Sequence, residues 1–163
     1  MAISVISIGI IQTPFKDING MPIQPSGAQD VPGQLVLDPQ YEEGLCDLDG
    51  FSHLILLYHF HLSKGYSLKA KPFLDTVERG LFSTRAPRRP NPIGLSIVRL
   101  NRIDGRILHI LDVDMLDGTP LLDIKPYVPT FDIRSDVRAG WLEQSQERST
   151  SLKSDQRLSL IHI

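Results

Sequence analysis

The sequence predicts an all-β domain, mainly antiparallel, with one or two short helices and a long N-terminal loop. We count about six or seven short runs rich in β-branched and aromatic residues, separated by turn residues. These runs do not alternate regularly with helical patterns, which argues against a doubly wound α/β sheet. A chain of 163 residues suits one domain with one core. The residues by themselves therefore favour a small antiparallel barrel or sandwich.

The expected strands are short apolar runs bounded by residues that stop a strand. The first ends at Thr13-Pro14, because proline cannot continue the ladder of a central strand. Two later runs form a hairpin around Asp104-Gly105, since this pair tolerates positive φ. In chain order the expected strands cover residues 3–11, 34–37, 52–62, 93–103, 106–111 and 121–128.

A long loop and one short helix lie between the first strands. Residues 14–33 carry four prolines and three glycines, and a loop this long in a compact domain is usually functional or disordered. The helix begins after Asp38, which suits the N-cap, with Pro39 at its first position. Gly44 or Gly50 ends it.

Charge, cysteine content and hydropathy limit the function classes. A net charge of −2 argues against a surface that binds nucleic acid everywhere, so an RNA contact requires a local basic patch. The single cysteine, Cys46, excludes an intramolecular disulfide, fits a reducing cytosol and predicts a buried, inert thiol. The apolar run Leu54–Tyr58 is far shorter than the roughly 20 residues that span a bilayer, and the N-terminus lacks the pattern of a signal peptide. We therefore expect a cytoplasmic protein with no membrane partner.

The segment FSTRAPRRPNPIG, residues 82–94, places three arginines on backbone stiffened by three prolines. Guanidinium groups pair bidentately with carboxylates and phosphates. Because proline fixes φ, the loop is held in place before an anion binds. The segment predicts an anion-binding loop, and the alternative is a solvated basic loop balanced by nearby acids. The arginines are Arg85, Arg88 and Arg89.

A second polar group follows the turn Asp117-Gly118-Thr119-Pro120, in which Asp caps and Gly accepts positive φ. Polar and apolar residues alternate along the strand after this turn, which puts an acid, a base and a phenol on one face. That face lies either in solvent or in a polar site. The polar set is Asp123, Lys125 and Tyr127, and the apolar set is Leu122, Ile124 and Val128.

Three histidines share one face of an expected strand. His59 and His61 are two residues apart, and His53 falls on the same face by parity. One cysteine and no further ligand cluster argue against zinc, so we expect no metal and a hydrogen-bonding or ligand-contacting role instead. The patterns G-x-G-x-x-G, G-x-x-x-x-G-K-[ST] and G-x-S-x-G are missing, which removes the usual nucleotide cradles and the hydrolase nucleophile elbow.

The segment GLFSTRAPRRPNPIG, Gly80–Gly94, closely resembles the signature of the TsaA-like (TrmO) family. Phe51-Ser52-His53-Leu54 and the stretch from Asp117 to Tyr127 resemble two further family blocks in the right order. The likeness covers roughly residues 4–131. We therefore expect a TsaA-like β-barrel domain at 1–131 and a C-terminal extension at 132–163 that is partly ordered or dimer-associated.

The resemblance implies a β-barrel that binds S-adenosylmethionine without a Rossmann fold, usually as a homodimer. It also implies methylation of N6 of threonylcarbamoyl-adenosine at position 37, beside the anticodon, in certain tRNAs. The alternative is a non-catalytic module of the same fold that binds S-adenosylmethionine or RNA, and the overall acidity of the chain favours it.

The resemblance assigns binding roles to the residues of this chain that occupy the matching motif positions. Arg88 and Arg89 become candidates for tRNA phosphates or for holding their loop together, and Lys125 is a further candidate for RNA. The implied cofactor contacts are Gln24, Pro25, His61, Arg85, Leu95, Asp117, Gly118, Thr119 and Pro120.

The implied reaction requires a group with base character, because N6 belongs to a urea whose lone pair is delocalised. Asp123, Tyr127 and His61 are the catalytic candidates, and the sequence does not rank them. The fixed charge of Arg85 suits a carboxylate, either of the cofactor's methionine or of the substrate's threonine, and would be repelled by a sulfonium. Arg85 is therefore expected to orient rather than react.

Overall fold

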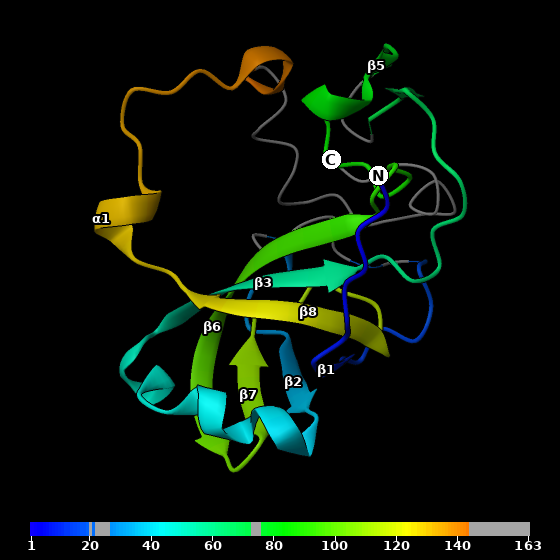
Figure 1. Cartoon of the computed structure of the whole chain (residues 1–163). Helices are drawn as coiled ribbons and strands as arrows, with labels where there is room; N and C mark the ends of the chain where they lie inside the picture. The colour runs from blue at the N-terminus through cyan, green and yellow to red at the C-terminus, as the bar shows by residue number, and fades with distance from the viewer. Residues whose placement is uncertain (20, 22–26, 73–75, 144–163) are drawn as a thin grey trace.

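Within the residues that the structure describes, 1–19, 21, 27–72 and 76–143, the chain forms a closed antiparallel barrel of six strands. The computed structural model in Figure 1 has the strand order β1-β2-β7-β6-β3-β8, and β8 pairs with β1 to close the barrel. The predicted all-β antiparallel class is confirmed, and the barrel rather than the sandwich is the correct alternative. The strands are β1 Gly9–Gln12, β2 Pro32–Leu37, β3 His53–His59, β6 Ile93–Asp104, β7 Ile107–Leu111 and β8 Thr119–Pro126.

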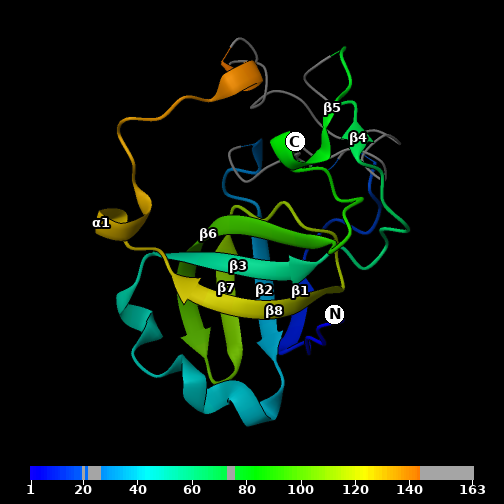
Figure 2. The ribbon, with the colours of Figure 1, turned by 45° about the horizontal axis from the view of Figure 1, so that its top comes forward.

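Short elements cover the two ends of the barrel. Figure 2 shows the 3-10 helices η2 and η3 (cyan) at one end, and the small β4–β5 sheet with η4 (green) at the other. After β8 the chain passes through α1 to η5, where Trp141 Nε1 donates to the carbonyl of Ser83 at 2.9 Å. The bounds are η2 Pro39–Leu45, η3 Leu48–Gly50, β4 Lys69–Ala70, β5 Arg79–Gly80, η4 Leu81–Ser83, α1 Pro129–Asp132 and η5 Gly140–Leu142.

The core fills the barrel interior because side chains alternate between the two faces of each strand. Along β3, every second residue is buried, from Leu54 through Leu56 to Tyr58. Tyr58 is 2% exposed although it carries a hydroxyl. The buried core residues are Ile11, Leu35, Leu37, Leu54, Leu56, Tyr58, Val98, Leu108, Ile110, Val113, Met115 and Leu121.

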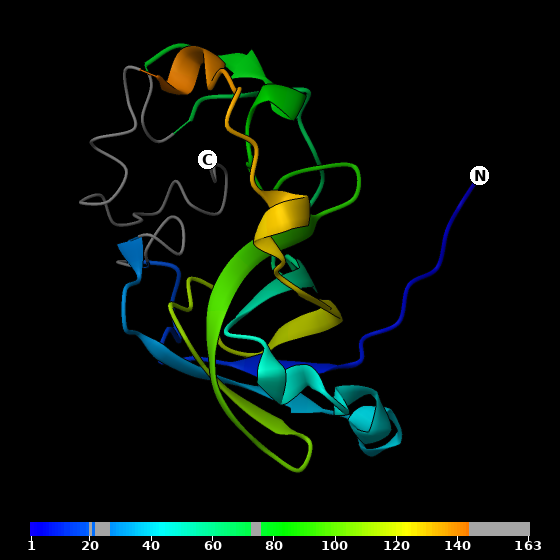
Figure 3. The ribbon, with the colours of Figure 1, turned by 90° about the vertical axis from the view of Figure 1, so that its left-hand side faces the viewer.

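The first predicted strand, residues 3–11, is too long. Only Gly9–Gln12 forms β1, and β8 pairs with β1 solely through Gly9–Ile11. Residues 1–7, among them Ile3 and Val5, are exposed, and Figure 3 shows the N-terminal segment running away from the barrel. A run of β-branched residues therefore does not form a strand where no neighbouring strand is present to pair with it.

Two predictions about strand faces are wrong. β3 ends at His59, and a turn follows in which Ser63 N donates to Phe60 O at 2.9 Å, so His61 does not share a strand face with His53 and His59. In β8 the register with β3 shifts beside Leu57/Tyr58, because an extra residue opposes the partner strand there. The buried residue is therefore Leu121, whereas Leu122 is half-buried.

Of the remaining local predictions, some are confirmed and some are wrong. Asp38 is the N-cap of η2 with Pro39 at its first position, as expected, but η2 is a 3-10 helix that ends at Leu45. The hairpin turn places Gly105 at φ +55, in the region that favours glycine. Cys46 is exposed, which contradicts the predicted buried thiol, because η2 buries no residue. In the described part of the chain, no helix is long and apolar enough to cross a membrane.

Gly94 is required by the packing between β3 and β6. It lies opposite Tyr58 in the ladder. A Cβ at Gly94 would lie 2.2 Å from Tyr58 Cε2 and 2.9 Å from Phe60 Cζ, both far inside contact distance. The two rings are fixed against each other, edge to face, with centroids 5.4 Å apart. Glycine therefore lets the Tyr58 ring lie flat over β6.

We predict that Gly94→Ala lowers the free energy of unfolding by roughly 1–3 kcal/mol, because the added methyl group must displace the Tyr58 ring. Urea denaturation measures this change. The matched control is Gly44→Ala in η2, where an added Cβ meets no atom within 4 Å. Equal stability of the two variants would contradict the packing argument.

Candidate functional site

A pocket opens where β3 ends, beside the loop that joins β7 to β8. The space within it and at its mouth, open solvent included, amounts to about 650 Å³. Its walls are mainly apolar, with a few polar groups among them. The lining residues are Ile18, Met21, Tyr58, Phe60, His61, Leu62, Ser63, Pro87, Asp114, Met115, Leu116 and Thr119.

Asp114 is a buried acid in this pocket, 4% exposed. Ser96 Oγ donates to its Oδ1 at 2.8 Å, and Tyr58 Oη lies 2.9 Å from Ser96 Oγ. Since the Ser96 proton points to Asp114, the Tyr58 hydroxyl donates to Ser96. Asp114 Oδ2 has no hydrogen-bond partner among the described residues. A buried carboxyl oxygen without a partner is costly, and a cation brought close to it would offset that cost.

Burial sets the proton affinities of this group. It raises the pKa of Asp114 to about 7, while the hydrogen bond from Ser96 and the charge of Arg85 act in the opposite direction. Burial, and then the charge of Asp114, raise the pKa of Tyr58 well above its usual value, so Tyr58 remains a donor. Near neutral pH, Asp114 therefore exchanges a proton for little free energy.

His61 lines the same pocket from the turn after β3. Partial burial lowers the pKa of its imidazole below 6.5, and the neighbouring His59 lowers it further. The ring is therefore neutral near pH 7, and one nitrogen can accept a proton.

The Asp117 turn fixes the N-terminal loop beside the pocket. Asp117 Oδ1 accepts from Thr13 N at 2.9 Å, and Lys16 Nζ lies 2.5 Å from Asp117 Oδ2. These contacts, with Lys16 first, lower the pKa of Asp117. Gly118 has φ +77, which confirms the positive φ predicted for this turn. The half-buried Pro120 follows in β8, next to the pocket residue Thr119.

The arginine loop forms another wall through Pro87, whose carbonyl accepts from Ser63 Oγ at 3.1 Å. Arg89 Nη1 donates to the carbonyls of Thr84 at 2.9 Å and Ala86 at 3.3 Å, which supports the loop-holding alternative for this residue. Arg85 is exposed yet close enough to act electrostatically on Asp114. The three arginines differ in exposure, because Arg88 and Arg89 are half-buried and Arg85 is exposed.

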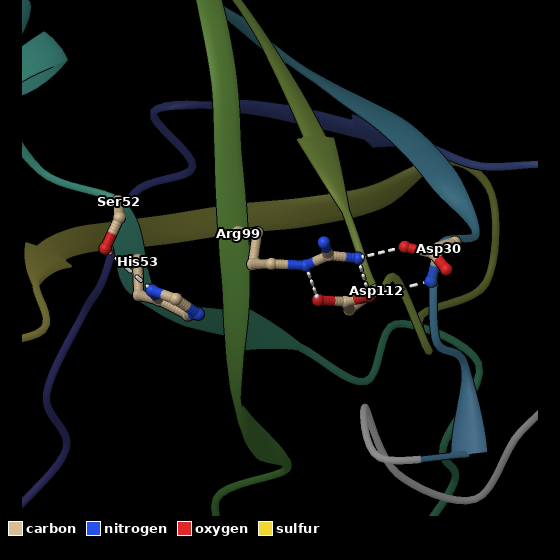
Figure 4. A network of polar contacts seen from close by, with 5 residues as sticks. All are labelled: Asp30, Ser52, His53, Arg99 and Asp112. Carbon is tan, nitrogen blue, oxygen red and sulfur yellow. Dashed lines mark hydrogen bonds and ion pairs between the residues drawn. The ribbon is translucent and has the colours of Figure 1, made fainter.

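A salt-bridge network holds the segment that leads to Asp114. Figure 4 shows the Arg99 guanidinium between the carboxylates of Asp30 and Asp112. Arg99 Nε donates to Asp112 Oδ2 at 2.6 Å, and Asp30 N donates to Asp112 Oδ1 at 2.8 Å. Both aspartates have positive φ, 62° and 71°, a conformation that non-glycine residues rarely adopt. Arg99 therefore stabilises the turn two residues before Asp114.

Several predicted site residues do not line the pocket. Asp123 pairs with Lys125 at 2.8 Å, both partly accessible, so the polar face of β8 faces solvent. The Tyr127 ring lies 6.2 Å from that of His53, near the other end of β3. Leu95 is 48% exposed on the outer face of β6, opposite in direction to its neighbour Ser96. Gln24 and Pro25 lie outside the described residues. The roles given to these residues stay predictions.

Sequence reasoning missed the group formed by Tyr58, Ser96 and Asp114. Asp114 appears in the sequence as one of three acids within DVDMLD, with nothing to indicate which is buried. The available signal was Ser96, a polar residue at an inward position of the alternating run that became β6. In the described part of the chain, no group of three or more His, Cys, Asp or Glu is arranged to hold a metal ion.

Comparison with known proteins identifies relatives of this barrel. The family model described as the tRNA-methyltransferase O N-terminal domain matches residues 10–133. A protein of Pyrococcus abyssi named a probable S-adenosyl-L-methionine-binding protein is 53% identical over 92% of this chain and 82% of its own length. The human tRNA (adenine(37)-N6)-methyltransferase is 37% identical over 80% of this chain and 31% of its own length.

Solved structures agree. The crystal structure of TrmO from Pseudomonas aeruginosa superposes with a TM-score of 0.73 at 40% identity, over 86% of this chain and 63% of that chain. The chain thus spans less than two thirds of the Pseudomonas protein and under a third of the human one. On the family match and these identities, the chain belongs to the tRNA-methyltransferase O (TrmO) N-terminal domain family.

Proposed function

We propose that this protein is an S-adenosylmethionine-dependent tRNA methyltransferase that methylates N6 of threonylcarbamoyl-adenosine at position 37. The observation that carries the proposal is a mainly apolar pocket with a buried, partly unpaired carboxyl group, in a barrel of the TrmO family. A human relative named tRNA (adenine(37)-N6)-methyltransferase supports the reaction. The Pyrococcus relative, named for S-adenosyl-L-methionine binding, supports the cofactor.

The lining of the pocket fits this cofactor. S-adenosylmethionine combines apolar and aromatic portions with positive charge, and when bound it supplies an electrophilic methyl group on a sulfonium. The apolar walls of the pocket suit the apolar and aromatic portions of the cofactor, and the unpaired carboxyl oxygen of Asp114 suits its positive charge. His61 and Thr119 are predicted cofactor contacts that line the pocket, and Asp117 and Gly118 form the adjoining turn.

We assign orientation and proton acceptance to different residues. Arg85 orients a carboxylate, because its charge is fixed and exposed at the loop that forms one wall. His61 is the preferred candidate for the base, because it lines the pocket and its lowered pKa leaves it neutral. Asp123 and Tyr127 would act only on a substrate that reaches the outer side of the barrel near β8.

A basic cavity next to the arginine loop suits the RNA backbone. Lys69, Lys71 and Arg88 line it together with Ser67. Arg88 Nε is buried and has no hydrogen-bond partner among the described residues. Three cations at one place are the local basic patch that an acidic chain requires for RNA.

We extend the proposal to a homodimer through the outer face of β6. Ile93, Leu95 and Ile97 are 42%, 48% and 38% exposed in succession on this face. Contiguous apolar side chains on a surface are typical of a protein interface. Leu95, an implied cofactor contact, points away from the pocket of its own barrel, so a second subunit is the simplest way to bring it to a cofactor.

The first test is a methyl-transfer assay with labelled S-adenosylmethionine and two tRNA pools, one with and one without the threonylcarbamoyl group. We predict label only in the modified pool, at the nucleotide beside the anticodon. His61→Asn should slow transfer by roughly 100-fold or more if His61 is the base. Asp49→Asn, an exposed acid at the opposite end of the barrel, is the control.

The other two outcomes of this methyl-transfer assay would each contradict a part of the proposal. Label in both pools would contradict the substrate class. No label in either pool despite cofactor binding would contradict the enzyme and favour the non-catalytic binding module.

The dimer has its own test. We predict that Ile97→Glu converts the protein from dimer to monomer in light scattering, because it places a charge on the outer face of β6 without touching the core. Leu68→Glu, at a side chain that is 62% exposed elsewhere, should leave the dimer intact. A monomeric wild-type protein would contradict the proposed interface.

A further inference from the structure

We propose that Asp114 is the counter-ion for the sulfonium of S-adenosylmethionine, so that the pocket holds the methyl donor more tightly than S-adenosylhomocysteine, its uncharged-sulfur product. The inference rests on the proposed function and deepens it, because it names the group that discriminates the two forms of the cofactor.

One oxygen of the Asp114 carboxyl group is held by a hydrogen bond, and the other has no partner among the described residues. Oδ1 is held by Ser96, which Tyr58 orients in turn. Oδ2 is buried within the pocket lining and has no partner among the described residues. The carboxyl group is therefore fixed in place before a ligand arrives, which lowers the entropic cost of binding.

The surroundings favour an alkylated cation over other ligands. Tyr58 and Phe60 bring two aromatic rings to the lining, and Met115 adds a thioether. Aromatic faces attract onium ions, as in sites that bind quaternary ammonium groups. An ammonium group would need acceptors for three N–H bonds. A sulfonium needs none, because three carbon substituents surround its charge, and it suits a pocket whose walls are mainly apolar.

The charge of the sulfur decides which form of the cofactor Asp114 holds more tightly. Burial of an unpaired carboxylate is unfavourable, and a cation within the pocket offsets that cost. In methyl transfer the S–CH3 bond breaks with its electron pair left on sulfur, the N6 lone pair forms the new C–N bond, and the N6 proton passes to the base. The sulfur is then neutral, and Asp114 has lost its counter-ion. The reacted cofactor is therefore held less tightly than the donor.

The test is calorimetric titration of the full chain with S-adenosylmethionine and, separately, with S-adenosylhomocysteine. We expect wild-type protein to bind S-adenosylmethionine more tightly. Asp114→Asn keeps the shape of the side chain and removes its charge, so it should weaken S-adenosylmethionine about tenfold or more and S-adenosylhomocysteine less than about threefold. Asp49→Asn is the matched control and should change neither affinity.

The outcomes separate this inference from the proposed function. Equal weakening of both ligands by Asp114→Asn, or weakening of neither, would overturn the counter-ion and leave the cofactor assignment standing. Failure of the wild-type protein to bind either ligand would overturn both.

The pH dependence of binding to the wild-type protein gives a second test, which does not require Asp114→Asn to fold. The wild-type affinity for S-adenosylmethionine should fall as pH drops below about 7, where Asp114 gains a proton, while that for S-adenosylhomocysteine changes less. The other ionisable groups that face Asp114 or share its pocket are Tyr58, Arg85 and His61. Tyr58 keeps its proton in this range, and the contribution of His61 is measured with His61→Asn. A pH profile that is the same for both ligands would overturn the inference.

Discussion

The hydrogen-bond chain from Tyr58 through Ser96 to Asp114 is the interaction on which the site depends. It joins β3, β6 and the loop before β8, and so fixes the mouth of the barrel. Gly94 makes it possible, because any side chain there would displace the Tyr58 ring. Arg99 supports it from outside by holding Asp112, two residues before Asp114. A buried polar chain of this kind is favourable only when its members are paired, and the one unpaired oxygen lies among the residues that line the pocket.

The signature residues of the family serve more than one purpose in this chain. Pro87 forms a wall of the pocket, Arg89 holds its own loop through carbonyl contacts, and Gly94 admits the Tyr58 ring. Among the three arginines of this segment, Arg85 alone is in the exposed class. Part of the dense positive charge of the loop is therefore structural, because Arg89 donates to carbonyls of its own loop.

Much of the fold follows from local patterns, and most of the site does not. The apolar run within residues 52–62 and the glycine at position 105 predict β3 and the β6–β7 hairpin, because these features depend on neighbours in sequence. The register shift in β8 buries Leu121 and leaves Leu122, a member of the predicted apolar face, half-buried, since a bulge depends on the partner strand. The burial of Asp114 depends on Ser96, 18 residues earlier, and no single-sequence pattern encodes that pairing.

The proposed site depends on the protonation state of Asp114, a buried carboxyl group whose charge would hold a cation. Its direct measurement is a carbon-13 NMR titration of the Asp114 carboxyl, assigned with Asp114→Asn, in free protein and with each form of the cofactor. We expect a pKa of about 7 in the free protein, a much lower pKa with S-adenosylmethionine, and no comparable fall with S-adenosylhomocysteine. An ordinary pKa near 3.8 in the free protein, or the same response to both ligands, would contradict it.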